Sequence, residues 1–129
     1  MTLAPTAGPT ILVVEDDEGV RVAVDRILTR HGYRVLVARD ASEALTIADR
    51  HGATVRLVIA DLVLPQVPGR ALIDELTRRG IQAPALFISG YGEADIEQRG
   101  LGETGIPLLR KPFTPKQLVS AIRDRLTAR

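Results

Sequence analysis

The sequence contains no cysteine, carries almost no net charge and lacks any long hydrophobic run. Without cysteine, disulfide bonds, thiolate metal sites and a cysteine nucleophile are excluded, and residence in the cytoplasm is compatible with the composition. The formal net charge is +1, so electrostatics gives no reason to expect nucleic acid or an anionic membrane as a partner. No apolar stretch is long enough to span a bilayer.

The chain has the length of a single domain. Its 129 residues can bury an ordinary hydrophobic core without disulfide bonds, and nothing in the sequence indicates a second domain. Residues 1–9 lack the basic start and the apolar stretch of a signal peptide, so we expect a flexible leader. We therefore expect one folded domain over residues 10–127.

The rest of the prediction is organised around residues 57–65, with the sequence LVIADLVLP. Residues 57–60 are all apolar, without alternation, which is typical of a strand covered on both faces in a parallel sheet. Asp61 follows directly. Because parallel sheets hold their sites at the carboxyl ends of the strands, Asp61 is the first candidate for a functional residue.

Apolar runs and amphipathic stretches alternate along the chain. Asp40 followed by Glu43, and Thr114 followed by Gln117, predict capped helix starts. This alternation predicts a doubly wound α/β fold, with an open parallel sheet and helices on both faces. The other predicted strands are residues 11–14, 34–38, 84–88 and 106–109, and the predicted helices are residues 18–31, 41–51, 70–79, 93–99 and 115–126.

Polar residues follow four of the predicted strands. They are Glu15 and Asp16, then Asp61, then Ser89, then Lys111. Three carboxylates at one edge of a sheet repel each other unless a cation shares the space. Oxygen ligands without histidine or cysteine select a hard divalent ion, and Mg²⁺ prefers octahedral geometry at about 2.0–2.1 Å. The sequence therefore predicts a magnesium site.

A carboxylate beside Mg²⁺ can accept a phosphoryl group. Phosphoryl transfer asks a protein mainly for positioning and for neutralisation of charge. Asp61 would be the nucleophile, and the product would be an aspartyl phosphate. Mg²⁺ and Lys111 would neutralise phosphoryl oxygens, while the hydroxyl of Ser89 would donate a hydrogen bond.

Four motifs occur in order: VVEDD at residues 13–17, DLVLP at 61–65, FISGY at 87–91 and KPF at 111–113. Over residues 10 to 127 the chain resembles the receiver domain of two-component response regulators, most closely receivers of hybrid histidine kinases or stand-alone receivers. The resemblance implies strand order 2-1-3-4-5 and Asp61 as phosphoacceptor. It also implies phosphate from a histidine kinase or histidine phosphotransfer protein, and an unidentified downstream protein partner.

The resemblance also implies roles at the metal. Glu15 and Asp16 match the acidic pair of the family, with Asp16 as the more direct ligand. Asp61 and the backbone carbonyl of Val63 would complete the protein ligands.

The same resemblance implies a switch, with two departures from the family pattern. Ser89 would be the hydroxyl that moves toward the phosphoryl group, Lys111 would pair with that group, and a cis peptide would precede Pro112. Leu108 stands where the family usually has an aromatic residue, so a change of an aromatic rotamer coupled to Ser89 is not available. The signal would instead pass through the loop that follows residue 88 and the fourth predicted helix. Pro68 stands where an acid is common.

Three other interpretations compete with a phosphorylated switch. Alone, Asp61 could be a helix cap or a turn residue. A haloacid dehalogenase type of phosphatase needs a second acid two residues after the nucleophile, where this chain has Val63. A receiver-like interaction domain without phosphorylation would usually lack an acid or the lysine, and none is missing. We therefore expect a signalling receiver rather than a turnover enzyme.

Overall fold

The computed structural model describes residues 8–100 and 105–127. Residues 1–7 of the expected leader, and residues 101–104, lie outside the described residues. Within the described part of the chain, no helix combines the length and the apolar character needed to cross a membrane.

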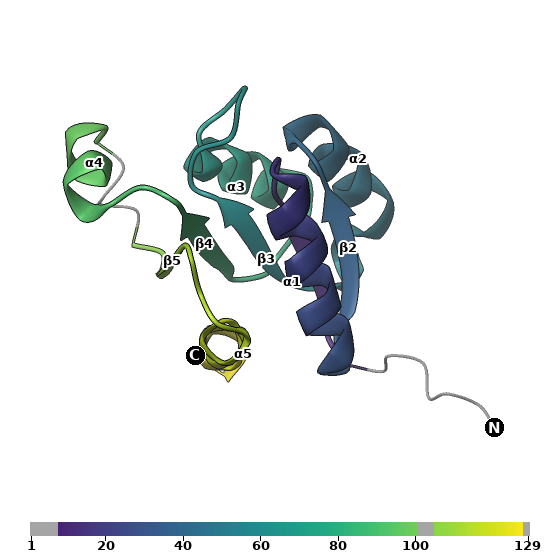
Figure 1. Ribbon diagram of the computed structural model, residues 1–129. Coiled ribbons are helices and arrows are strands. Elements are labelled where there is room, and N and C mark those ends of the chain that lie inside the picture. Colours follow the sequence, from purple (N-terminus) through teal and green to yellow (C-terminus); the bar gives the residue numbers. More distant parts are fainter. Residues whose placement is uncertain (1–7, 101–104, 128–129) are drawn as a thin grey trace.

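The centre of the molecule is a five-stranded sheet in the order β2-β1-β3-β4-β5, with every neighbouring pair parallel. Figure 1 shows β2, β3, β4 and β5 of this sheet in that order. This confirms the predicted fold and strand order. The sequence order and the spatial order differ because the chain reverses its direction of growth after β2. The strands are β1 (Thr10–Val14), β2 (Arg34–Ala38), β3 (Val55–Asp61), β4 (Ala85–Ser89) and β5 (Leu108–Arg110).

Helices cover both faces of the sheet. α1 and α5 pack on one face, and α2, α3 and α4 pack on the other, as their buried residues in two separate core clusters show. Their bounds are α1 (Glu18–Arg30), α2 (Ala41–His51), α3 (Gly69–Arg78), α4 (Glu93–Gln98) and α5 (Pro115–Thr127), with a short 3₁₀ helix η1 (Gly52–Thr54) before β3.

The predicted helix starts are present, one of them in altered form. At α5 the capping box is complete: Gln117 N–H donates to Thr114 Oγ1 at 3.0 Å, and Thr114 N–H donates to Gln117 Oε1 at 2.8 Å. At α2, Glu43 N–H donates to Asp40 Oδ1, but the Glu43 carboxylate accepts from the N–H of Arg39. The Glu43 carboxylate lies beside Arg39, and not beside the N–H of Asp40, because it also forms an ion pair with the Arg39 guanidinium.

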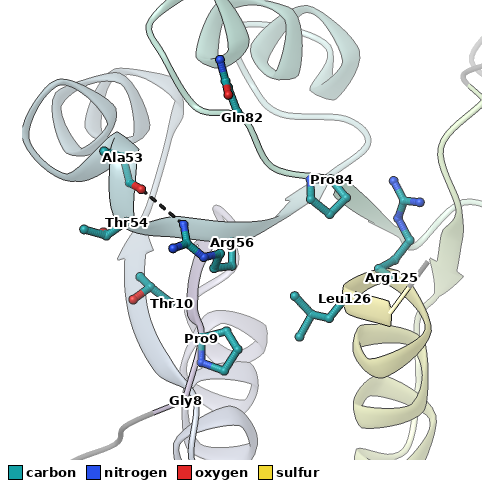
Figure 2. Close-up of a pocket in the computed structure, with 10 residues that line it drawn as sticks. All are labelled: Gly8, Pro9, Thr10, Ala53, Thr54, Arg56, Gln82, Pro84, Arg125 and Leu126. Atoms are coloured by element: carbon teal, nitrogen blue, oxygen red, sulfur yellow. Dashed lines mark hydrogen bonds between the residues drawn. The ribbon is translucent and has the colours of Figure 1, made fainter. Parts of the chain in front are cut away.

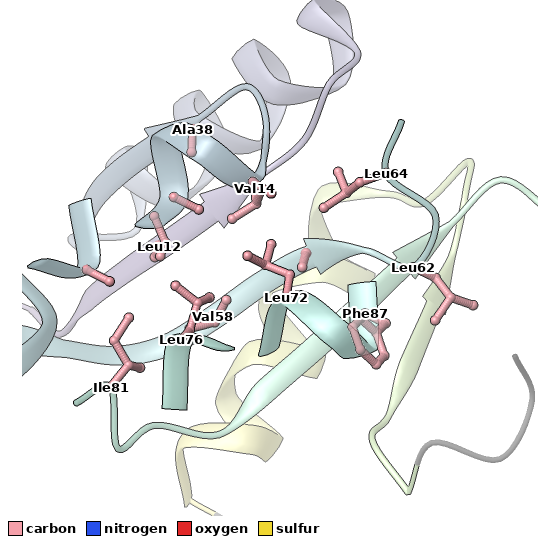
Figure 3. Close-up of a cluster of buried hydrophobic side chains, with 14 of the residues drawn as sticks. Leu12, Val14, Ala38, Val58, Leu62, Leu64, Leu72, Leu76, Ile81 and Phe87 are labelled. Atoms are coloured by element: carbon pink, nitrogen blue, oxygen red, sulfur yellow. The ribbon is translucent and has the colours of Figure 1, made fainter. Parts of the chain in front are cut away.

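The core divides by the alternation of side chains along the strands. Leu12 and Val14 of β1 and Val58 of β3 belong to the same cluster as Phe87 of β4 and the buried residues of α2 and α3 (Figure 3). Ala60 of β3 is a further member of this cluster. The intervening residues of the same strands face α1 and α5. Every residue of β1 and β4 is buried, as expected for strands covered on both faces. The strand ends that carry polar residues are therefore held on a rigid base.

The fifth strand differs from its prediction. The sequence pattern predicts residues 106–109, whereas β5 is the shorter segment Leu108–Arg110. β5 lies at the edge of the sheet and pairs only with β4, so its extent depends on which residues reach Phe87, Ile88 and Ser89 rather than on its own apolar run. Leu108 is 38% exposed and does not fill the interior.

Candidate functional site

The register of the sheet brings the polar side chains that follow its strands to one carboxyl edge. Val14 is opposite Ala60, so Glu15 follows β1 beside Asp61 at the end of β3. Ser89, at the end of β4, is opposite Arg110, and its carbonyl accepts a 2.8 Å hydrogen bond from Lys111 N–H. The predicted convergence is confirmed. Carboxylate oxygens of Glu15, Asp16 and Asp61 lie within 4.8 Å of one another.

Lys111 lies between two of these carboxylates. Its Nζ is 2.6 Å from Glu15 Oε1 and 3.1 Å from Asp61 Oδ2. Burial alone would lower the pKa of Lys111, but the hydrogen bonds to Glu15 and Asp61 outweigh burial, so the pKa lies above its usual value. The side chain is 20% exposed. The cis peptide expected between Lys111 and Pro112 is present.

Glu15 is completely buried. Burial raises the pKa of its carboxyl to about 7, against the opposing effects of Lys111 and of the N–H of Asp17, and with a further upward contribution from Asp61. Oε2 accepts the Asp17 N–H at 3.0 Å. Oε1 has Lys111 as an ion-pair partner, but it receives no well-oriented hydrogen bond from the described residues.

This donor set fits a hard divalent cation. The Lys111 ammonium is paired with two of the carboxylates, Glu15 and Asp61, and Asp16 brings a third carboxylate to the same place, so three acids share one positive charge. The cluster contains neither histidine nor cysteine, as Mg²⁺ prefers. The predicted ligands Glu15, Asp16 and Asp61 are thus brought together.

The loop after β3 fixes the orientation of Asp61. Val63 N–H donates to Asp61 Oδ1 at 2.9 Å, so Oδ2 is the oxygen that faces Lys111. Gly69 N–H donates to the carbonyl of Leu62 at 2.8 Å, which ties the start of α3 to the same loop. Asp61 is buried, with 8% of its surface exposed. Val63 therefore orients Asp61 through its amide, a contact that the sequence did not predict.

Ser89 lies at the same edge, and its side chain is hydrogen-bonded to the loop that follows β4. Its buried Oγ accepts a 3.0 Å hydrogen bond from Tyr91 N–H. A serine hydroxyl has one donor and two acceptor sites, so this contact leaves its proton free to be donated. The Tyr91 ring is in turn covered by the guanidinium of Arg99, 4.4 Å from the ring centroid.

Two roles were not predicted from the sequence: the contacts of Arg21 with the backbone, and the capping of α1 by Asp17. Arg21 Nη1 donates to the carbonyl oxygens of Glu15 and Asp16 at 3.0 and 3.4 Å. Asp17 is exposed and caps α1 by accepting from Val20 N–H. A contact between a side chain and a backbone carbonyl leaves no spacing signal that the sequence pattern could have revealed.

A cavity of about 750 Å³ lies at the opposite edge of the sheet (Figure 2). Its lining comes from the starts of β1 and β3, the segment before β4 and the end of α5, and Arg56 donates to the Ala53 carbonyl within it. No residue of the acidic cluster lines this cavity. The candidate site is therefore the carboxyl edge of the sheet and not this cavity.

The raised pKa of Glu15 predicts an unusual pH dependence in the metal-free protein. Its pKa is about 7 when folded, against 4.5 for a free carboxyl, so between these values the folded chain keeps a proton that the unfolded chain has released. The free energy of unfolding should therefore fall as pH rises through this window, by on the order of 3 kcal/mol from this group. Urea unfolding with EDTA at about pH 5 and about pH 8 measures the change.

The matched variants are Glu15→Gln, which removes the titrating group, and Glu18→Gln, the same change at an exposed acid. We expect the Glu15→Gln protein to lose less stability between the two pH values than the native protein, and Glu18→Gln to behave like the native protein. The same loss in all three proteins would contradict the assignment.

Comparison with known proteins identifies the family. The model described as "Response regulator receiver domain" matches residues 11–123. The chain is 34% identical over 117 residues to Sensor kinase CckA of Brucella abortus (strain 2308). The matched region covers 91% of this chain and 12% of that protein. It is 33% identical over 119 residues to the uncharacterized transcriptional regulatory protein YbdJ of Bacillus subtilis (strain 168), covering 92% and 51%. The chain thus spans about half or less of these relatives.

Solved structures show the same arrangement of elements. The receiver domain from the hybrid histidine kinase CckA superposes with a TM-score of 0.77 at 36% identity, covering 92% of this chain and 99% of that chain. The chemotaxis protein CheY4 of Vibrio cholerae gives a TM-score of 0.78 at 27% identity, covering 93% and 100%.

Proposed function

The chain belongs to the receiver domain family of response regulators, and from this premise we propose that Asp61 accepts a phosphoryl group. Receiver domains interact with histidine kinases or phosphotransfer proteins, so the donor would be a phosphohistidine of such a protein. The observation that carries the proposal is the position of Asp61. One oxygen is held by Val63, and the other faces Lys111 beside two further acids.

In the proposed reaction, a carboxylate oxygen of Asp61 forms a bond to phosphorus while the bond from phosphorus to the donor imidazole nitrogen breaks. The electron pair of that bond stays on the imidazole, which then takes up a proton from water. The Val63 amide holds the Asp61 carboxylate in one orientation during the attack. The product is an aspartyl phosphate on this chain.

The metal would be Mg²⁺, held by the carboxylates of Glu15, Asp16 and Asp61 and by the carbonyl of Val63. When bound, it supplies positive charge to the phosphoryl oxygens and orients them for transfer. Lys111, already directed at Asp61 Oδ2, would bind a phosphoryl oxygen once the phosphoryl group is attached.

Ser89 would report the modification. Its hydroxyl proton is free to be donated to a phosphoryl oxygen, and the turn of the side chain that this requires would alter its contact with Tyr91 N–H. The chain would therefore act as a switch whose surface near β4 and α4 changes for a downstream protein partner. As a switch, the chain would not turn over a substrate. The phosphoryl transfer would take place in the cytoplasm, as is usual for the family.

Intact-mass analysis after incubation with acetyl phosphate and Mg²⁺ tests the proposal. We expect the native chain to gain one phosphoryl group, and Asp61→Asn to gain none, because an amide is a poor nucleophile. Asp124→Asn makes the same change at an exposed acid of α5 and should be modified like the native chain.

An adduct that forms equally on Asp61→Asn would show that another residue is the acceptor. Absence of any adduct on the native chain, together with no binding of beryllofluoride as a phosphoryl mimic, would refute phosphorylation. The domain would then be an interaction module of the same fold.

A further inference from the structure

Arg21 connects helix α1 to the loop that carries two of the three acids. It lies in the first turn of α1, and its backbone N–H donates to the carbonyl of Asp17 at 2.9 Å. Its half-buried side chain turns back along the chain, where Nη1 reaches the carbonyl oxygens of Glu15 and Asp16. One guanidinium group thus contacts two consecutive peptide units.

The other hydrogen bonds of this loop act on different atoms. Glu15 N–H donates to the carbonyl of Ala38, and Glu15 Oε2 accepts from Asp17 N–H. Asp17 Oδ1 accepts from Val20 N–H. Among the hydrogen bonds of the described residues, only those from Arg21 engage the carbonyl oxygens of Glu15 and Asp16.

The orientation of these carbonyl groups determines where the carboxylates point. The peptide unit between Glu15 and Asp16, and the next one, fix the backbone of Asp16, from which an exposed carboxylate reaches the cluster. If the two peptide units rotate, that carboxylate leaves the space shared with Asp61. Holding ligands in place before binding lowers the entropic cost of binding.

We propose that Arg21 is a positioning residue, which fixes the peptide units of Glu15 and Asp16 so that both carboxylates face Asp61 before a divalent cation binds. This rests on the proposed function, because it concerns the same metal site. It adds a residue that touches neither the cation nor the phosphoryl group and acts only through the backbone of the ligands.

A pure charge effect of Arg21 has the opposite sign. Its guanidinium is a positive charge beside several acids, and it repels a divalent cation at the same place. If only this Coulomb repulsion mattered, removal of the guanidinium would make Mg²⁺ bind more tightly. Loss of positioning makes Mg²⁺ bind more weakly. The direction of the change in Mg²⁺ affinity therefore separates the two roles.

Calorimetric titration of the full chain with Mg²⁺ measures this direction. We expect Arg21→Met to bind Mg²⁺ roughly tenfold more weakly than the native chain, the lower end of the loss seen when an outer partner of a metal ligand is removed. Arg21→Lys keeps the charge but cannot reach both carbonyls equally well, so its affinity should be intermediate. Arg26→Met removes the same charge from an exposed position of α1 and should bind like the native chain.

Amide hydrogen exchange of the metal-free proteins provides a readout that does not depend on Mg²⁺. The Asp17 N–H, bonded to Glu15 Oε2, should exchange faster in Arg21→Met than in Arg26→Met, because the loop is no longer held. Thermal unfolding of each variant verifies that it is folded. If Arg21→Met does not fold, Arg21→Lys takes its place in both measurements.

Mg²⁺ binding by Arg21→Met that is equal to or tighter than that of Arg26→Met would overturn the positioning role, while leaving the proposed function intact. The positioning role would also be overturned if Arg21→Lys had the same Mg²⁺ affinity and the same exchange rate at the Asp17 N–H as the native chain. Absence of both Mg²⁺ binding and phosphoryl uptake in the native chain would instead refute the proposed function, and this inference with it.

Discussion

Replacing Lys111 with methionine is expected to destabilise the metal-free protein by about 3 kcal/mol. Methionine has a similar length and fills the same space, but the change removes the positive charge between Glu15 Oε1 and Asp61 Oδ2. Breaking a buried ion pair from one side costs about 3–5 kcal/mol, and the partial exposure of Lys111 places the expected value at the lower end. Chemical unfolding in the presence of EDTA measures the loss.

Mg²⁺ should restore most of this stability. A divalent cation at the three carboxylates supplies the charge that the ammonium provided, and a cation at one hundred times its Kd adds about 2.7 kcal/mol. The gain on adding Mg²⁺ should be larger in Lys111→Met than in the native protein, where the ammonium competes for the same oxygens.

The matched control is Lys116→Met, which makes the same chemical change at an exposed position of α5. It should alter the free energy of unfolding by less than about 0.5 kcal/mol, with or without Mg²⁺. If the two variants were equally stable with EDTA, the ammonium of Lys111 would not be the counter-charge of the buried carboxylates.

The sequence predicted those parts of the site that local rules determine. Unbroken apolar runs identified β1, β3 and β4, and each run ended at the polar residue that the structure places at the sheet edge. Parallel connection of strands then brings such ends together whatever the details of packing. For this reason Glu15, Asp61 and Lys111 can be predicted as a group from the sequence.

Contacts that depend on the folded environment were not accessible in this way. The raised pKa of Glu15 results from burial by neighbours distant in sequence. Arg21 acts on backbone carbonyls, and Glu43 prefers Arg39 to the expected partner because a guanidinium lies within reach. The limits of β5 follow from pairing with β4 at the sheet edge. In each case the deciding atom belongs to another element or to the main chain.

Gly69→Ala should have an effect of similar size on stability, through the backbone that carries Asp61. A Cβ atom at this position would lie 2.5 Å from the carbonyl oxygen of Asp61, 3.1 Å from Leu62 Cα and 3.0 Å from Phe87 Cε1. Two of these atoms are main-chain atoms at the end of a buried strand, so they cannot move aside cheaply. We expect a loss of about 3 kcal/mol, or a fall in the thermal midpoint of roughly 10 °C.

The comparison variant is Gly19→Ala, which also places alanine in the first turn of a helix. Both changes bring the same gain in helix propensity, but the Cβ at residue 19 meets only the side-chain oxygen Asp17 Oδ1, at 3.3 Å. Its stability should stay within about 1 kcal/mol of the native protein. Equal stability of the two variants would show that the loop after β3 yields easily.

Gly69→Ala should also slow phosphoryl uptake while leaving Lys111 and Glu15 chemically intact. The added methyl group pushes on the carbonyl of Asp61, and the adjoining loop provides the Val63 amide that orients the Asp61 carboxylate. A shift of this peptide misaligns the carboxylate oxygen with an incoming phosphorus atom, and small misplacements of reacting groups cost about 10²-fold in rate. The rate of adduct formation with acetyl phosphate, at a temperature where Gly69→Ala is still folded, measures this effect. A native rate in a destabilised protein would mean that the clash is relieved within α3 and does not reach Asp61.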